Sequence, residues 1–95
     1  MLEHREVVLP FIHLNGDRAE TLVENLSEVY DALNEVDDKL RMCAPNGRNA
    51  YQVDGLMEKL VEQHKYRLDL LRELLLSVEE EVQGILDQPG LGTNL

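Results

Sequence analysis

The sequence is poor in cysteine and in aromatic residues. It contains one Cys, no Trp and one Phe among 95 residues. A single cysteine excludes an intramolecular disulfide and predicts a reduced, cytoplasmic setting. Because 43% of the chain is hydrophobic with almost no aromatic bulk, aliphatic side chains must supply the core. Long aliphatic segments of this kind usually fill a helical bundle.

Positive charge is also scarce. Nine Lys and Arg stand against 19 Asp and Glu, which gives a formal net charge of −10. This charge opposes binding to long nucleic acid, where neutralisation of phosphates supplies most of the affinity. It leaves room for a small anionic ligand in a local basic pocket.

Long apolar runs are missing as well. No run approaches the roughly 18 apolar residues that a membrane span requires, so no membrane partner is expected. Residues 1–16 do not resemble a signal peptide, since charged residues crowd the start and Pro10 interrupts the apolar run that follows. Pro10 disfavours helix at its own position and at Leu9. The sequence therefore predicts an extended N-terminal arm over residues 1–16.

A first helix is predicted over residues 17–43. Asp17 follows the turn-forming pair Asn15-Gly16 and, with Glu20 three residues later, has the pattern of a capping box. Apolar residues then recur at alternating spacings of three and four, which is a heptad seam. The members of this seam are Leu22, Leu26, Val29, Leu33, Val36, Leu40 and Cys43. Cys43 continues the seam and is expected to be a small buried hydrophobic residue.

A second helix is predicted over residues 54–87, with Asp54 as its N-cap. Its seam alternates spacings of four and three, through Met57, Val61, His64, Leu68, Leu71, Leu75, Val78, Val82 and Ile85. Pro45 and the pair Asn46-Gly47 indicate a connecting loop over residues 44–53. Pro89 and Gly90 predict a helix end and a flexible tail over residues 88–95.

Two long helices with a short connection predict an all-α fold, a long antiparallel helical hairpin with an extended N-terminal arm. Leu60, Leu74 and Leu76 add apolar surface beyond the seam of the second helix. One partner helix cannot cover all of it, so hairpins are expected to assemble into an oligomeric helical bundle, a homo-oligomer that is a dimer or larger.

The densest group of polar recognition residues lies in the loop: Asn46, Arg48, Asn49 and Tyr51 fall within six residues. Their side chains can donate hydrogen bonds to phosphate, carboxylate or base edges. An ordinary solvated loop is the competing interpretation, with Arg48 as a surface arginine.

Two further pairs extend this candidate ligand-binding set. His64 and Arg67 lie one turn apart on the second helix, although a histidine in an apolar seam also fits an ordinary core position. His13 and Asn15 precede the first helix, whose free N–H groups favour anions, although a turn and cap explain them equally well.

The sequence shows no enzyme constellation. It lacks a nucleophile elbow or a local base signature. Three His and one Cys are scattered without paired ligand spacing, so no metal and no cofactor are expected.

Three motifs together carry a resemblance to a known group. They are residues 13–16 (His-Leu-Asn-Gly), residues 44–51 with Ala-Pro-Asn-Gly-Arg at their start, and residues 62–68 with Glu-Gln-His at their start. Over about residues 12–86 the chain resembles small, uncharacterised helical proteins encoded by tailed phages and prophages. The resemblance implies a bacterial host cytoplasm. The chain departs from the pattern at Asn49-Ala50, where one aromatic of the loop is lost.

Two functions of different classes follow as hypotheses. Phages encode small helical oligomers that sequester cyclic nucleotide signals, and by analogy this chain would be a non-enzymatic anti-defence protein. It would bind a small anionic nucleotide, a cyclic dinucleotide in the first instance, in pockets of a homo-oligomer. The alternative is a structural or regulatory interaction module that docks a host or phage protein. An acidic helix face that mimics DNA is a third, weaker option.

Overall fold

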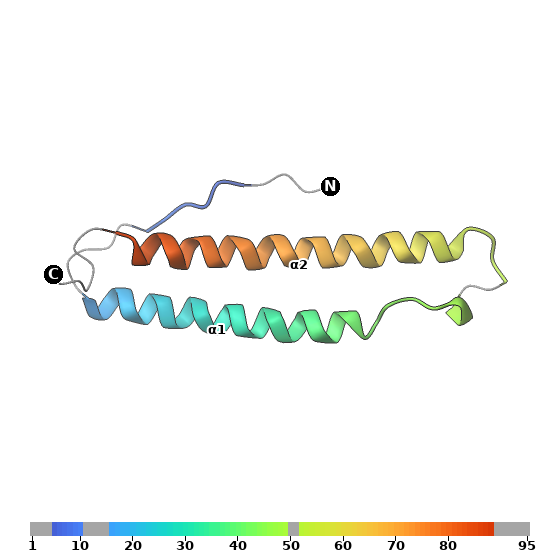
Figure 1. The fold of residues 1–95 in the computed structure, drawn as a ribbon, viewed down its shortest axis with the longest axis horizontal. Helices are drawn as coiled ribbons and strands as arrows, with labels where there is room; N and C mark the ends of the chain where they lie inside the picture. Colours follow the sequence, from blue (N-terminus) through green and yellow to red (C-terminus); the bar gives the residue numbers. More distant parts are fainter. Residues whose placement is uncertain (1–4, 11–15, 50–51, 89–95) are drawn as a thin grey trace.

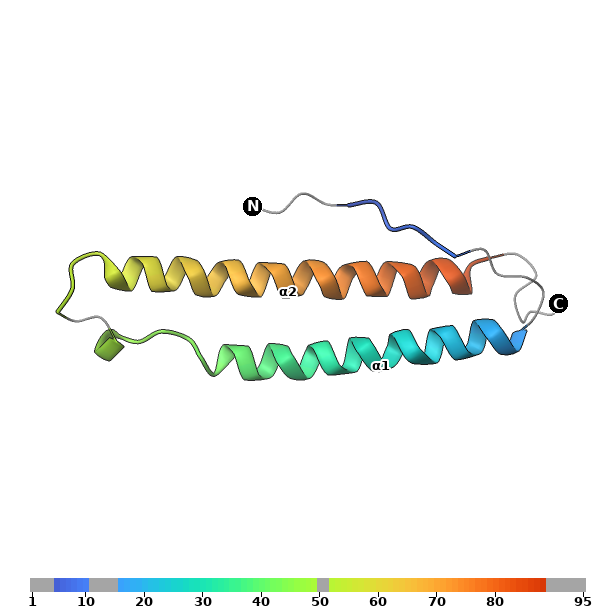
Figure 2. The same ribbon diagram turned by 180° about the vertical axis from the view of Figure 1, so that it is seen from behind.

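The structure is a computed structural model of the chain, and it describes residues 5–10, 16–49 and 52–88. Within these ranges all the regular secondary structure is helical, and there is no strand. Two long helices, α1 (Gly16–Arg41) and α2 (Leu56–Leu86), flank a short 3-10 helix, η1 (Gly47–Asn49). The long helices lie side by side and antiparallel, as a helical hairpin requires (Figures 1 and 2). The chain as a whole measures 64 × 24 × 15 Å along its principal axes.

The core between the two helices is thin. Among the described residues, only four apolar side chains are buried: Ala19, Leu71, Val78 and Ile85. The three members from α2 are spaced by seven residues, as the heptad seam predicts. Most other seam residues, Leu33 and Leu68 among them, are half-buried.

The end of α1 falls two residues earlier than predicted. The amides of Met42, Cys43 and Ala44 bond to carbonyls three residues back, at 3.1, 2.9 and 3.3 Å. These bonds tighten the final turn before Pro45, which disfavours helix at Ala44. Cys43 therefore leaves the seam and is exposed, so the expectation that it would be buried is wrong.

The start of α2 also differs from the prediction. The residue before the helix is Gly55, with φ 78° in the left-handed region, and no side chain caps the helix. Asp54 is thus not the N-cap, because the glycine makes the reversal that brings the chain into Leu56. At the other junction, α1 begins at Gly16, so Asp17 lies inside the helix and is not the residue that precedes it.

Residues 5–10 have no regular secondary structure and run along the side of α2 that faces away from α1 (Figure 1). The Gln88 side chain donates a hydrogen bond to the carbonyl of Pro10 at 2.9 Å. The Leu9 side chain lies against Gly84, where an added Cβ would come within 2.7 Å of it. The glycine therefore makes room for this segment on the last turns of α2.

The remaining parts of the predicted arm, residues 1–4 and 11–15, and the predicted tail from residue 89 onward lie outside the described residues. In the ranges that the structure describes, no helix is long and apolar enough to cross a membrane.

The thin core yields a test of stability. We expect Ile85→Ala to lower the free energy of unfolding by about 2–5 kcal/mol, because Ile85 is fully buried and its loss leaves a cavity. The neighbouring Leu86 is 51% exposed, and Leu86→Ala should cost less than about 1 kcal/mol. Urea denaturation followed by circular dichroism, at one fixed protein concentration, compares the two. Equal costs would contradict the assignment of the core.

Candidate functional site

The predicted polar loop is organised around η1. The side-chain oxygen of Asn46 accepts a hydrogen bond from the backbone amide of Arg48 at 2.9 Å, which closes a local turn. The Arg48 side chain is exposed. Asn49 ends η1, and Tyr51, His13 and Asn15 lie outside the described residues. The loop therefore presents Arg48 to solvent on an ordered turn.

The other predicted pair lies farther along α2. His64 is half-buried in the seam and Arg67 is exposed. From the start of α2 at Leu56, a rise of 1.5 Å per residue places them about 12 and 16 Å along the helix. In the part of the chain that the structure describes, no hydrogen bond or ion pair joins either of them to Arg48. Their convergence with the loop into one ligand site stays a prediction.

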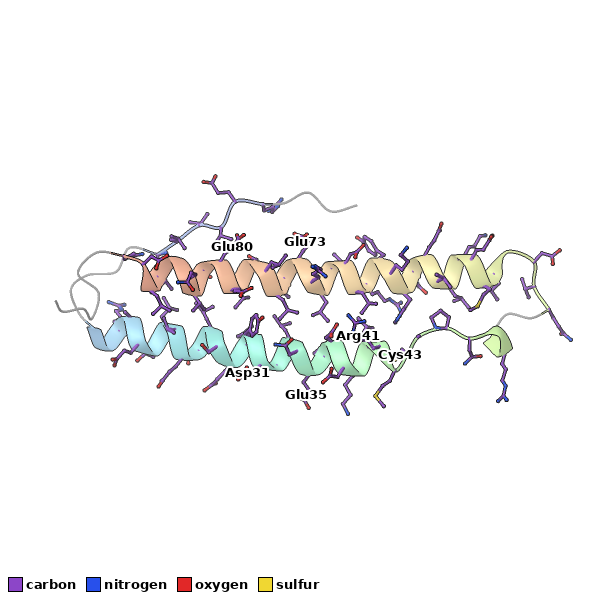
Figure 3. All side chains as sticks on the ribbon, viewed as in Figure 1. Asp31, Glu35, Arg41, Cys43, Glu73 and Glu80 are labelled. Atoms are coloured by element: carbon purple, nitrogen blue, oxygen red, sulfur yellow. The ribbon has the colours of Figure 1, made fainter. Side chains whose placement is uncertain are left out.

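A groove between the two helices holds a cluster of charges that the sequence reasoning missed. It has a volume of about 360 Å³ and is lined by Asp37, Arg41, Lys65, Leu68, Asp69, Arg72 and Leu75. Arg41 donates from Nε to the carboxylate of Asp37 at 3.0 Å. Figure 3 shows Arg41 at the end of α1, between the helices. The spacings of four between Asp37 and Arg41 and between Lys65 and Asp69 were a visible signal for such a cluster.

A second, smaller groove continues along the same side of the hairpin. It has a volume of about 240 Å³ and is lined by Ser27, Tyr30, Asp31, Glu79 and Val82. The two grooves together define one long side of the rod, which we call the polar flank. Acidic side chains also project from the outer surfaces: Asp31 and Glu35 from α1 and Glu73 and Glu80 from α2 (Figure 3).

The opposite long side, which we call the apolar flank, is lined by Val29, Ala32 and Val36 of α1 and Leu70 and Leu74 of α2. Successive helix residues lie about 100° apart around the axis. Leu71 is buried against α1, and Arg72, the next residue, lines the polar flank. Leu70, which precedes Leu71, therefore lies on the apolar flank. The same geometry places Ala32 and Val36 opposite the groove residues of α1.

The apolar flank is open to solvent in the single chain. The exposed fractions are 44% for Val29, 48% for Val36, 40% for Leu70 and 49% for Leu74. A shallow groove of about 500 Å³ runs along the α1 part of this flank, lined by Ala32, Glu35, Val36, Lys39, Leu40 and Cys43. A row of exposed aliphatic residues beside a groove is typical of a protein–protein contact surface.

Charge is distributed unequally along the rod. The cations of α2 are Lys59, Lys65, Arg67 and Arg72, all in its first part, whereas residues 73–86 carry four Glu and no Lys or Arg. On α1 the basic residues of the last turn are Lys39 and Arg41. With Arg48, the end of the hairpin near the loop therefore holds most of the positive charge, and the end where α1 begins is strongly acidic.

The described residues contain no group of three or more His, Cys, Asp or Glu arranged to hold a metal ion. Within the same ranges, no buried polar side-chain atom lacks a hydrogen-bond partner.

A scan against protein-family models and searches of the curated proteins and of the solved structures found no match to this chain. The functional argument therefore rests on its own residues and geometry.

The ion pair between Arg41 and Asp37 can be tested for its contribution to the stability of the hairpin. The side chains of Arg41 and Asp37 are 63% and 25% exposed, and exposed ion pairs contribute little to stability. We expect Asp37→Asn to lower the free energy of unfolding by less than about 1 kcal/mol. Urea denaturation at low and high salt measures it. A larger loss that salt abolishes would show that the pair is a structural requirement.

Proposed function

We propose that this protein is a non-enzymatic helical module whose primary activity is to assemble with copies of itself through the apolar flank. The observation that carries this proposal is the row of exposed aliphatic side chains on one side of a hairpin whose own core is thin. Val36 and Leu74, each about half exposed, are its clearest members.

The total surface supports the same proposal. The single chain exposes 7692 Å². A compact monomer of 10.9 kDa exposes about 5,600 Å² by the usual scaling of area with mass. The difference, about 2,100 Å², exceeds the roughly 800 Å² that each partner buries in a standard interface. A contact of standard size with a further copy would cover part of this difference.

We include in this proposal that the chain is a phage or prophage protein, as its sequence motifs suggest. The protein would then act in the cytoplasm of the bacterial host. An assembled bundle would present Arg48 of η1 at its surface, with the acidic outer faces around it. Such a bundle can serve as a scaffold for a host or phage protein, which is the structural or regulatory role.

Sequestration of a small anionic nucleotide is the second candidate function, and the cation-rich end of the hairpin favours it. Seven of the nine Lys and Arg lie between residues 39 and 72. Cations kept together in an acidic protein attract an anion locally without a basic overall field. A homo-oligomer would bring several such ends or loops into pockets suited to a cyclic dinucleotide.

Assembly through the apolar flank is tested by a matched pair of substitutions. We expect Val36→Asp to shift the protein to a monomer, because the new carboxylate would be desolvated at the contact. Val61 is 39% exposed, close to the 48% of Val36, but it lies toward the polar flank, so Val61→Asp should leave assembly unchanged. Light scattering between about 1 and 100 µM, near typical dissociation constants of such interfaces, reports the masses. A monomeric parent protein throughout that range would refute self-assembly.

Nucleotide binding is tested by calorimetry against cyclic mono-, di- and trinucleotides. If a phosphate meets the loop, Arg48→Ala should weaken binding by about 1.5–3 kcal/mol, the usual worth of a charge-assisted hydrogen bond, with little change in folding. Arg18→Ala, at the acidic end of α1, is the control and should bind like the parent protein. Absence of heat with every nucleotide, in folded and ligand-free protein, would remove this second candidate.

A further inference from the structure

Three residues of α2 are spaced evenly along the apolar flank. Arg67, Leu74 and Glu81 are seven residues apart, so they lie on one stripe of the helix, with the two charges about 10 Å to either side of Leu74. Arg67 is exposed and Glu81 is half-buried. Within the described residues neither forms an ion pair with another side chain of the same chain. The stripe thus has one cation, one central aliphatic residue and one carboxylate.

This arrangement is self-complementary under a two-fold rotation. An axis that passes beside Leu74, perpendicular to the helix, brings Leu74 against its own copy. It also brings each Arg67 to the Glu81 of the second copy, so that one contact produces two identical ion pairs. We propose that two copies of this chain pair antiparallel through their apolar flanks, with the two-fold axis at Leu74. This inference rests on the proposed self-assembly and specifies its geometry.

The long-range charge favours the same direction. A parallel pair would place the acidic ends of both hairpins together and would oppose Arg67 to Arg67 and Glu81 to Glu81. The antiparallel pair instead places the cation-rich end of one copy, near the loop, beside the acidic end of the other copy. This lowers the electrostatic repulsion between two chains that each carry a net charge of −10.

The α1 side of the flank fits this contact. Ala32 is the smallest residue of the flank and lies between Val29 and Val36, beside the shallow groove that also reaches Leu40. A small side chain at the middle of the contact allows the two hairpins to approach closely, while the valines on either side supply apolar area. The self-complementary stripe of Arg67, Leu74 and Glu81 is what identifies the occupant of this flank as a second copy of the chain.

The ion pairs are tested by single and double charge reversals. We expect Arg67→Glu and Glu81→Arg each to raise the dissociation constant of the dimer by about tenfold or more, since each places two like-charged pairs in the interface. The double variant Arg67→Glu/Glu81→Arg restores both pairs and should return to within about threefold of the parent value. Analytical ultracentrifugation measures the constants, and circular dichroism confirms that each variant is helical.

A matched pair on the polar flank supplies the control. Arg72 and Glu79 are also seven residues apart on α2, but they line the two grooves of the polar flank. Arg72→Glu and Glu79→Arg should leave the dissociation constant unchanged.

The outcomes separate the two proposals. A parent protein that stays monomeric would overturn both self-assembly and this geometry. A dimeric parent whose single reversals bind as tightly as it does would overturn the antiparallel geometry alone, because in a parallel pair each reversal only exchanges one like-charged pair for another. Failure of the double variant to recover, while the control reversals dimerise normally, would also overturn it.

Discussion

Two helices can bury their apolar side chains only along the line where they touch, and in this hairpin the apolar residues are spread more widely than that line. Leu71, Val78 and Ile85 occupy the line and are buried, whereas Leu70 and Leu74, on the same helix, turn away from it and stay about half exposed. The hairpin therefore leaves aliphatic surface uncovered however well its helices pack. The proposed assembly is a response to this constraint.

The same constraint makes the two long sides of the rod different. On the polar flank, Asp37, Arg41 and Arg72 fill the groove between the helices with charges that water can reach. On the apolar flank, the central positions are aliphatic, and Arg67 and Glu81 lie to either side of Leu74 where a second copy can pair them. A contact on the apolar flank removes hydrocarbon from water, while a contact on the polar flank would desolvate charges and gain little. The choice of side for self-association follows from this difference.

Much of the fold could be predicted from the sequence, because heptad spacing is a local signal that survives in the structure. The two helices, the connection between them and the absence of a strand among the described residues all agree with it. The predictions were wrong at the helix ends, because the residue at which a helix begins or ends depends on the backbone turn beside it. α1 ends in a tight turn before Pro45, so Cys43 does not continue the seam. The residue before α2 is Gly55, in the left-handed region, and not the predicted Asp54.

The site was harder to predict. Periodicity places Val36 in the seam of the first helix and Leu74 beyond the seam of the second, but it does not show that both fall on the same long side of the hairpin. That fact depends on which side of α1 meets which side of α2, and the two lateral grooves establish it. The signals were the density of polar residues for Arg48 and the one-turn spacing from Arg67 for His64, and a local signal of this kind marks only where recognition chemistry is available. It carries no information on whether those residues meet.

Small-angle X-ray scattering of the parent protein tests the central claim, that the hairpin completes its core with a second copy lying alongside it. The account predicts a mass at least twice 10.9 kDa. It also predicts a maximum dimension only slightly greater than the 64 Å extent of one chain, since an axis near the middle of α2 makes the two rods overlap almost fully. A monomeric mass at about 100 µM, far above the dissociation constant of a stable homodimer, would contradict the account. So would an oligomer nearly twice as long as one hairpin, because its copies would meet end to end and leave the apolar flank bare.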